Sequence, residues 1–341
     1  MSPDIYPKFS VVPITMPEAD NTSSALASRG CLRITSTSSM ASSVAPANVA
    51  FAKRLVFSDG VLQTINRVFN VMNRSANSWN AKYPERIVCL TEETTETLYL
   101  LGEQDRIVGI SGFTVRPPEA RRDKPKVSAF TSAKIDKILV LEPDLVIGFS
   151  DLQADIAKDL VAAGVNTLVF NQRSVTEILS MILTLSGSIG CSDKGEELVK
   201  GYVERIETVR AAGLALKRRP KVYFEEWDEP MISAIQWVSE LINLAGGEDC
   251  FAQLGQESHA KNRIIADPQK VIDMNPDIII GSWCGKKFRP EKVAARPGWQ
   301  AINAVMNNQL HEVKSPLILQ PGPAALTDGL DEIHKIICAA V

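Results

Sequence analysis

Short apolar runs alternate with amphipathic segments along most of the chain after residue 85. Runs of β-favouring residues predict strands at 86–90, 106–110, 145–148 and 167–170. The segments between them, such as 93–101 and 152–163, have the apolar spacing of helices. The alternation resumes with a strand at 219–226 and continues to a last helix at 323–339. Strands that alternate with helices predict parallel sheets covered by helices.

One segment of this pattern occurs twice. Residues 137–148 and 270–281 match without a gap, so that Pro143 corresponds to Pro276 at an offset of 133 residues. Each copy has a short helix, a Pro-Asp break, an apolar strand and a glycine, and the proline ends the helix because it disfavours helical geometry in the residue before it. Chance recurrence of a common motif is one explanation. The other, which we favour, is two lobes of similar build with a ligand-binding cleft between them.

A pair of helices is predicted between the two copies. Ser174 and Glu177 form a capping box that opens a helix running to about residue 188. A second helix, about residues 193–217, has apolar residues at helical spacing and a charged opposite face. It is either a stiff connector between lobes or one of two ordinary surface helices. We predict an α/β fold of two Rossmann-like lobes with parallel sheets, 85–173 and 218–341, joined by the connecting helices of 174–217.

The first 84 residues differ from the rest. Residues 20–50 are rich in Ser, Thr, Ala and Asn, which is typical of a flexible segment, and 59–72 could form one amphipathic helix. We interpret 1–84 as a partly disordered N-terminal extension. A secretory signal is not predicted because a basic start followed by an apolar core is missing, and no apolar stretch before Cys31 supports a lipoprotein site.

Composition narrows the class of protein. The chain has 341 residues, 45% of them hydrophobic and 23% charged, with a net charge of −3. These values are ordinary for a soluble globular protein, and the dispersed Lys and Arg residues give no basic patch for nucleic acid. The six cysteines occur singly, so neither a zinc ribbon nor a disulfide framework is indicated. No run of eighteen apolar residues predicts a transmembrane helix.

Motifs of catalysis are missing. The sequence has no nucleophile elbow, phosphate-binding loop or dinucleotide fingerprint. Glu225 and Glu226 are paired carboxylates, but adjacent residues of a strand point to opposite faces, so they are poorly placed to act together. None of the three histidines has metal-ligand spacing to another His or Cys. We therefore predict a binding protein and not an enzyme.

A set of segments, in this order and spacing, carries a resemblance to a known family: 86–96, Leu101-Gly102, 108–111, Pro117-Pro118, 137–144, 245–248 and 275–277. Over about residues 85–340 the chain resembles the substrate-binding proteins of ABC importers with a helical backbone, the class III periplasmic binding proteins. The resemblance is to their cobalamin- and ferric-siderophore-binding branch. It implies two lobes joined by a long helix, a ligand in the cleft and delivery of that ligand to a permease.

Loops at the carboxyl ends of the strands would face the cleft. Phe113 and Phe130 match two aromatic positions with which the cobalamin binders cover the corrin, and Trp227 and Trp283 could supply others. Near Arg263 and Leu317 the family's aromatic residues are replaced. The candidate ligand-binding residues are Glu93, Phe113, Arg116, Phe130, Glu226, Trp227, Trp283, Cys284, Lys286 and Gln320.

The resemblance also implies a docking surface for the permease. The family carries one acidic residue on each lobe, and the matching positions are Asp136 and Gln269, again 133 residues apart. The second position has lost its charge, although Asp267 lies nearby.

Two further kinds of site stay open. One is a direct metal site of His259, Glu225, Glu226 and Cys284. The other is a site for anionic chelates, which guanidinium and ammonium donors suit, made of Arg116, Arg263, Lys286, Lys287 and Arg289.

The sequence and the resemblance together predict a monomeric binding component of an ABC import system. It would bind cobalamin or a related metal chelate, deliver it to a permease with its ATPase, and hold no permanent cofactor. The alternatives are a protein that binds ferric siderophore, haem or a metal ion, and a corrinoid carrier that is not exported. The family is extracytoplasmic, whereas the N-terminus leaves a cytoplasmic location open.

Overall fold

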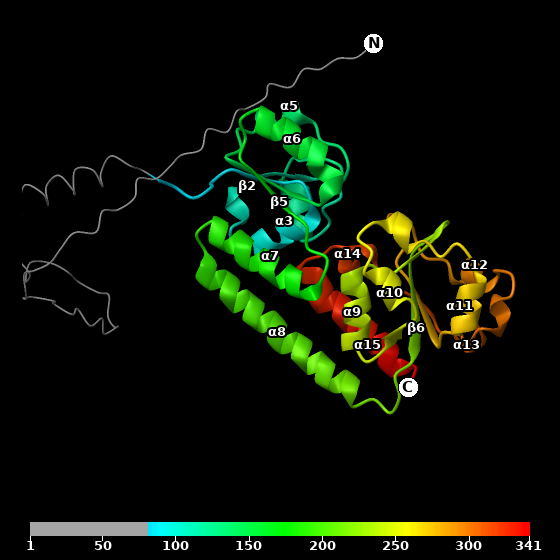
Figure 1. Ribbon diagram of the computed structural model, residues 1–341. Coiled ribbons are helices and arrows are strands. Elements are labelled where there is room, and N and C mark those ends of the chain that lie inside the picture. The colour runs from blue at the N-terminus through cyan, green and yellow to red at the C-terminus, as the bar shows by residue number, and fades with distance from the viewer. Residues whose placement is uncertain (1–80) are drawn as a thin grey trace, which may run out of the picture. The chain divides into compact units, whose positions relative to one another are not determined.

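The computed structural model describes residues 81–341, and the first lobe is built on a five-stranded parallel sheet (Figure 1). The predicted extension of residues 1–84, with its helix at 59–72, lies outside the described residues except for 81–84. The strand order is β3-β2-β1-β4-β5. The strands are β1 (Ile87–Cys89), β2 (Ile107–Ser111), β3 (Lys126–Ser128), β4 (Leu145–Phe149) and β5 (Thr167–Phe170). Because β1 and β4 are buried along their whole length, their sequences are continuous apolar runs.

Helices and short turns surround this sheet. They are α3 (Glu92–Leu100), η1 (Gln104–Arg106), α4 (Pro118–Asp123), α5 (Ile135–Leu139), η2 (Asp151–Gln153) and α6 (Ala154–Ala162). The predicted alternation of strands and helices is confirmed here, with ends that differ by at most two residues.

The second lobe has a mixed sheet of order β10-β9-β6-β7, with β8 also paired to β6. Its strands are β6 (Lys221–Asp228), β7 (Met231–Ser233), β8 (Glu248–Asp249), β9 (Ile278–Gly281) and β10 (Leu310–Glu312). The prediction of parallel strands is correct except for β7, which runs antiparallel to β6. Only Glu229 and Pro230 separate these two strands, and such a short connection can join only antiparallel neighbours.

The helices of this lobe are mostly short. They are α9 (Gln236–Leu244), α10 (Ala252–Gly255), η3 (Ala260–Arg263), α11 (Gln269–Met274), α12 (Pro290–Ala294), η4 (Trp299–Ala301), α13 (Asn303–Met306), α14 (Ser315–Ile318) and α15 (Leu330–Ala339). The predicted last helix begins instead with a π-helical turn, η5 (Ala325–Gly329).

The sequence repeat is a repeated structural unit. The first copy is α5 followed by β4, and the second is α11 followed by β9. In each copy the Asp after the proline fastens its strand to the neighbouring one. The carboxylate of Asp144 accepts from the N–H of Arg86 at 2.9 Å, and that of Asp277 accepts from the N–H of Lys221 at 3.0 Å. The Pro-Asp pair thus ends a helix and sets where the next strand starts.

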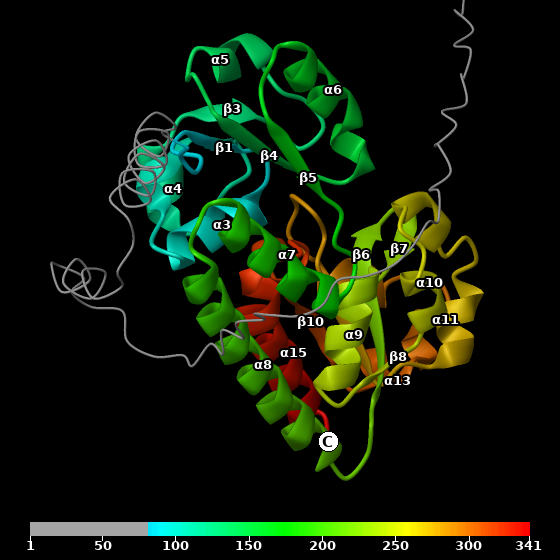
Figure 2. The same ribbon diagram turned by 60° about the vertical axis from the view of Figure 1, so that its left-hand side comes forward.

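Two helices connect the lobes, α7 (Val175–Ser188) and α8 (Ser192–Leu214). The predicted capping box at Ser174 and Glu177 is confirmed. The buried side of α8 includes Tyr202, Ile206 and Val209, and the helix packs on α7, α9 and α15 (Figure 2). One apolar core contains side chains of β1 and β2, of β6 and β9, and of α7, α8, α9 and α15. The connector is therefore part of a core that both lobes share.

Within residues 81–341, no helix is both long and apolar enough to cross a membrane.

Candidate functional site

Contacts between the lobes bring the carboxyl ends of the two sheets toward each other. After β5, the side-chain amide of Gln172 donates to the carbonyl oxygen of Pro321 at 3.0 Å. After β4, Asp151 lies between Arg173 of its own lobe, at 3.4 Å, and the His259 ring of the other lobe, at 3.7 Å. We call the residues that follow these strand ends the inter-lobe face. Asp151, Gln172 and Arg173 were not predicted to lie at this face. Their position shortly after the end of a strand could have indicated it.

The inter-lobe face has unused hydrogen-bonding groups. Among the described residues, buried polar atoms without a partner include several that end or follow a strand: Thr114 Oγ1, Ser128 Oγ, Gln172 Oε1, Arg173 Nε and Ser282 Oγ. They follow β2, β5 and β9 or end β3. Buried polar groups in folded proteins are normally hydrogen-bonded to protein, water or ligand. This edge of both sheets is therefore where a polar ligand would find donors and acceptors.

Two glutamates open helix α3 at this edge. Glu93 is 1% exposed and accepts a hydrogen bond from the Thr91 hydroxyl at 2.6 Å. Burial raises the pKa of Glu93 to about 7. Burial, followed by the charge of Glu93, raises the pKa of Glu92 to about 8. A Cβ atom on Gly322 would lie 2.4 Å from the Cβ of Glu93, so the C-terminal segment packs directly on this predicted site residue.

Arg116, predicted to bind ligand, is engaged in a bridge between distant segments. Its guanidinium donates to Glu96 at 2.9 Å and pairs with Asp328 of η5 at 2.9 Å. The other oxygen of Glu96 accepts from the backbone N–H of Ala324 at 3.2 Å. Since three groups already satisfy each other here, the structure gives Arg116 a structural role.

The two predicted aromatic residues of the first lobe differ in exposure. Phe113, in the loop after β2, is 57% exposed. Phe130 is half-buried, and its carbonyl oxygen accepts from the side chain of Gln153 at 2.8 Å. Phe113 therefore offers the larger free ring surface.

The end of β6 separates its two glutamates, as predicted for neighbours on a strand. Glu225 is fully buried and accepts from Arg296 at 2.6 and 2.9 Å, from the Tyr223 hydroxyl at 2.8 Å and from the indole N–H of Trp283 at 3.0 Å. Glu226 instead pairs with Arg263 at 2.6 Å. The predicted metal set is thus not brought together. Within residues 81–341, no group of three His, Cys, Asp or Glu side chains could hold a metal ion.

Trp283 lies in the core of the second lobe. It is 4% exposed, and its ring packs edge-on against Phe288 at a centroid distance of 5.1 Å. With its N–H held by Glu225, this ring has little free surface for a ligand. The ring still borders a hollow at the carboxyl ends of β9 and β10, so its role as a cleft-lining residue stays a prediction.

Trp227 and Lys286 form a contact of their own. Trp227 is half-buried and donates its indole N–H to the carbonyl oxygen of Glu229 at 2.8 Å. The Lys286 ammonium lies 3.9 Å from the centroid of the Trp227 ring and also pairs with Asp228. In the same loop, partial burial and the charges of Glu226 and Glu92 raise the pKa of Cys284. Cys284 is thus electrostatically coupled to a carboxylate of each lobe.

The remaining predicted residues lie apart from these contacts. Gln320 is half-buried in the segment that packs on α3. Asp136 and Gln269 are exposed in the first turns of the equivalent helices α5 and α11. Gln269 donates its N–H to the exposed Asp267 at 3.0 Å. Their role in docking stays a prediction.

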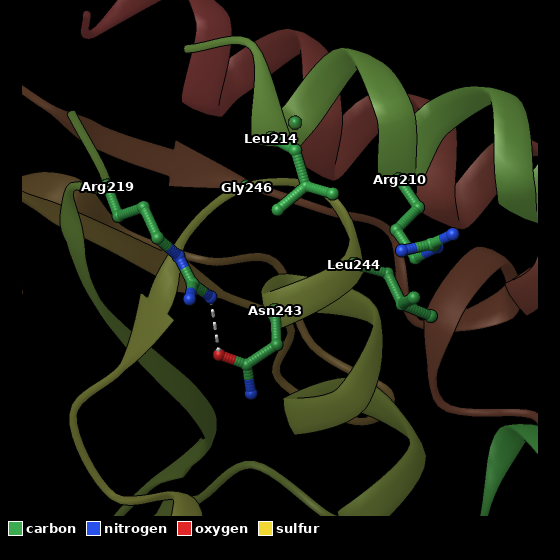
Figure 3. A pocket seen from close by; sticks show the side chains of 7 residues that line it. Arg210, Leu214, Arg219, Asn243, Leu244 and Gly246 are labelled. Carbon is green, nitrogen blue, oxygen red and sulfur yellow. Dashed lines mark hydrogen bonds between the residues drawn. The ribbon is translucent and has the colours of Figure 1, made fainter. Parts of the chain in front are cut away.

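Two hollows lie on the second lobe and its connector. The first, about 210 Å³, is lined by Arg210, Leu214, Arg219, Asn243 and Leu244 with two glycines (Figure 3). It lies beside the residues that precede β6, at the edge of the sheet opposite the inter-lobe face. The second, about 300 Å³, lies at the carboxyl ends of β9 and β10. Its lining residues are Trp283, Gly285, Lys286, Lys287, Glu312, Val313, Lys314, Ser315 and Pro316.

Solved structures share this fold. A possible iron-binding (periplasmic solute-binding) protein from Staphylococcus epidermidis covers 75% of this chain and 99% of its own, with 21% identity and a TM-score of 0.65. A periplasmic heme-binding protein from Roseiflexus sp. RS-1 covers 74% and 99%, with 23% identity and a TM-score of 0.65. The periplasmic vitamin B12-binding protein of Vibrio cholerae covers 76% and 99%, with 23% identity and a TM-score of 0.61.

Relatives found by sequence are named as substrate-binding and vitamin B12-binding proteins. An uncharacterized ABC transporter substrate-binding lipoprotein, YvrC of Bacillus subtilis, is 26% identical over 266 residues, 75% of this chain and 81% of the relative. A vitamin B12-binding protein of Vibrio cholerae is 26% identical over 258 residues, 73% of this chain and 87% of the relative. The sequence profile of the family described as periplasmic binding protein matches residues 87–317, more than half of the chain. The chain therefore belongs to the periplasmic binding protein family.

Proposed function

We propose that this protein binds cobalamin, or a related metal chelate, between its lobes and delivers it to a permease with its ATPase. The observation that carries the proposal is the row of buried, unpartnered polar atoms at the carboxyl ends of strands of both lobes. Relatives named as vitamin B12-binding proteins support cobalamin as the first ligand to test.

Binding would use a ring from each lobe and polar groups around them. Phe113 of the first lobe and Trp227 of the second supply flat apolar surface of the kind that packs on a macrocycle. The raised pKa of Glu92 keeps its carboxyl largely protonated at neutral pH, where it can donate a hydrogen bond to a carbonyl of the ligand. The chemistry is affinity and release, without bond making.

A second candidate is a chelate with a negatively charged edge, such as haem or a ferric siderophore. The 300 Å³ hollow favours it, because Lys286, Lys287 and Lys314 line it, although Lys286 pairs with Asp228 and Lys314 with Glu312. The anion-binding set predicted from the sequence is reduced, because Arg116 and Arg263 are already paired with carboxylates. A bare metal ion is a weaker candidate, because two of its predicted ligands are already paired with different arginines, Glu225 with Arg296 and Glu226 with Arg263.

Membership of the family supports a proposal for docking and for location. We propose that the permease contacts the exposed starts of α5 and α11, at Asp136 on the first lobe and at Gln269 with Asp267 on the second. Relatives named as lipoprotein and periplasmic proteins support an extracytoplasmic location. We also propose that the protein acts as a monomer. A non-exported corrinoid carrier is the alternative.

The test is titration of the full chain with cyanocobalamin, haemin and a ferric hydroxamate, each followed by calorimetry. We expect saturable binding of cyanocobalamin at micromolar or tighter dissociation constants. Trp227→Ala should weaken it by about tenfold, since it removes an aromatic contact surface. Leu214→Ala, on the hollow of Figure 3, is the control and should leave the affinity unchanged. Saturable binding of haemin or the hydroxamate instead would move the assignment to that ligand, and binding of none of the three would refute a metal chelate as the substrate.

A further inference from the structure

The exposed side of Trp227 is covered by the chain's own lysine. The Lys286 ammonium lies 3.9 Å from the Trp227 ring centroid and 5.1 Å from that of Trp283. It also forms an ion pair with Asp228, whose side chain is 16% exposed. Two indole rings and a carboxylate are the groups that attract a cation most strongly in proteins. The ammonium is therefore held over the ring by three attractions at once.

The elements at this point keep the arrangement in place. Trp227 and Asp228 are consecutive residues at the end of β6, so their side chains are fixed by the sheet. Lys286 lies in the loop after β9, and the loop is anchored by Trp283, whose N–H is bound to the buried Glu225. Lys286 itself is 39% exposed and sits on the edge of the 300 Å³ hollow. The lysine belongs to a loop and is partly exposed, whereas the ring belongs to the sheet, so the lysine can leave without disturbing the core.

We propose that Lys286 is a built-in competitor for the Trp227 ring, a specificity-determining residue that a ligand must displace before its flat face can stack there. This inference rests on the proposed function, because it takes Trp227 as a ligand-contacting ring. When a ligand displaces the lysine, the ammonium loses its contact with the ring and its pair with Asp228 is strained. Affinity for an uncharged flat ligand is accordingly lowered. A ligand with an anionic group compensates, because it gives the displaced ammonium a new partner.

Lys286→Met removes the charge and keeps most of the length of the side chain. We expect it to tighten the binding of cyanocobalamin by about threefold to tenfold, the size of a typical exposed cation–π contact together with its ion pair. Asp228→Asn should act in the same direction, and the double variant should gain no more than the stronger single variant, because both changes release one contact. Lys286→Arg should behave as the wild type. Lys292→Met, an exposed lysine of α12, is the matched control and should have no effect.

A second readout needs no ligand. Of the four tryptophans in the described residues, Trp237, Trp283 and Trp299 are at most 4% exposed, so only Trp227 is partly accessible to a quencher. In a Trp79→Phe background, acrylamide should quench the fluorescence of Lys286→Met more strongly than that of Lys286→Arg. Equal quenching would overturn the proposal, since the ring would not be covered in solution.

The two readouts separate this inference from the proposed function. If Lys286→Met shows stronger quenching and also binds cyanocobalamin more tightly, both the competition by Lys286 and the proposed function are supported. Stronger quenching with unchanged or weaker cyanocobalamin binding in Lys286→Met refutes competition by the lysine and leaves the proposed function standing. Stronger quenching without any binding of cyanocobalamin, haemin or a ferric hydroxamate, in the wild type or the variant, refutes the proposed ligand class and, with it, the role of Lys286 as a competitor.

Discussion

Glu93 shows how burial alters the chemistry of a residue that lies between lobes. It is 1% exposed, and burial raises the pKa of its carboxyl to about 7 from 4.5. Between these two values the folded protein keeps a proton that the unfolded chain has lost. The folded state then binds more protons, so the free energy of unfolding falls as pH rises through this window and levels off above it.

Replacing Glu93 with glutamine tests this. Glutamine has the same shape, accepts the hydrogen bond from Thr91, and stays neutral at every pH. We expect the wild type to lose about 1–3 kcal/mol of unfolding free energy between about pH 5 and pH 8 through this group. Glu93→Gln should lose less over the same range, as measured by urea unfolding at several pH values. Parallel pH curves for the two proteins would contradict a raised pKa at Glu93.

Two tryptophans show how far the position of a single side chain could be predicted from the sequence. Trp227 lies at the end of β6 and Trp283 follows β9, and both were predicted to line the site. The structure puts Trp227 at the surface and Trp283 in the core. The difference comes from Glu225 and Phe288, which bind and pack the second ring from other segments of the chain. Such contacts depend on the tertiary fold, and no local pattern in the sequence predicts them.

At the scale of elements, the repeat was predictable because its signals are local. A proline that ends a helix and an Asp that fastens the next strand act within a few residues or on the adjacent strand. The strand β7 was not predicted, since three residues give no alternation, and Glu229-Pro230 is not a common hairpin turn. The bridge of Arg116 was missed because its partners Glu96 and Asp328 lie far apart in the sequence, one in each lobe.

The glycine that ends the second copy of the repeat is required by packing. A Cβ atom on Gly281 would lie 1.9 Å from the ring of Phe288, which is 1% exposed and cannot yield easily. Gly281→Ala should therefore destabilise the protein by about 1–3 kcal/mol, in the range of overpacked cores. Denaturant unfolding monitored by circular dichroism measures this.

Gly201 provides a matched control for that substitution. It lies in the middle of α8 and is exposed, and a Cβ atom there would meet no neighbouring segment within 4 Å. Gly201→Ala should stabilise the protein by about 0.5–1 kcal/mol, because alanine is the better helix former. Equal effects of the two substitutions would show that packing against Phe288 is not what Gly281 serves.

At the scale of the whole molecule, the two lobes are tied by more than their connector. Side chains from both sheets belong to one apolar core, and the C-terminal segment is fastened to the first lobe by Gln172, Glu93 and the Arg116 bridge. Lobes that share a core and several polar contacts cannot unfold independently. We expect residues 81–341 to unfold in one cooperative transition.

The Arg116 bridge allows this coupling to be measured. Arg116→Met leaves the largely buried Glu96 without its charged partner, which should cost about 1–2 kcal/mol, less than a fully buried pair because Arg116 is one-third exposed. If the bridge couples the lobes, hydrogen exchange should rise at α3 of the first lobe and also at η5 and the start of α15. Adding Glu96→Gln should recover part of the loss, since the uncompensated carboxylate is then gone. Faster exchange confined to the loop around residue 116 would mean that the shared core alone holds the lobes together.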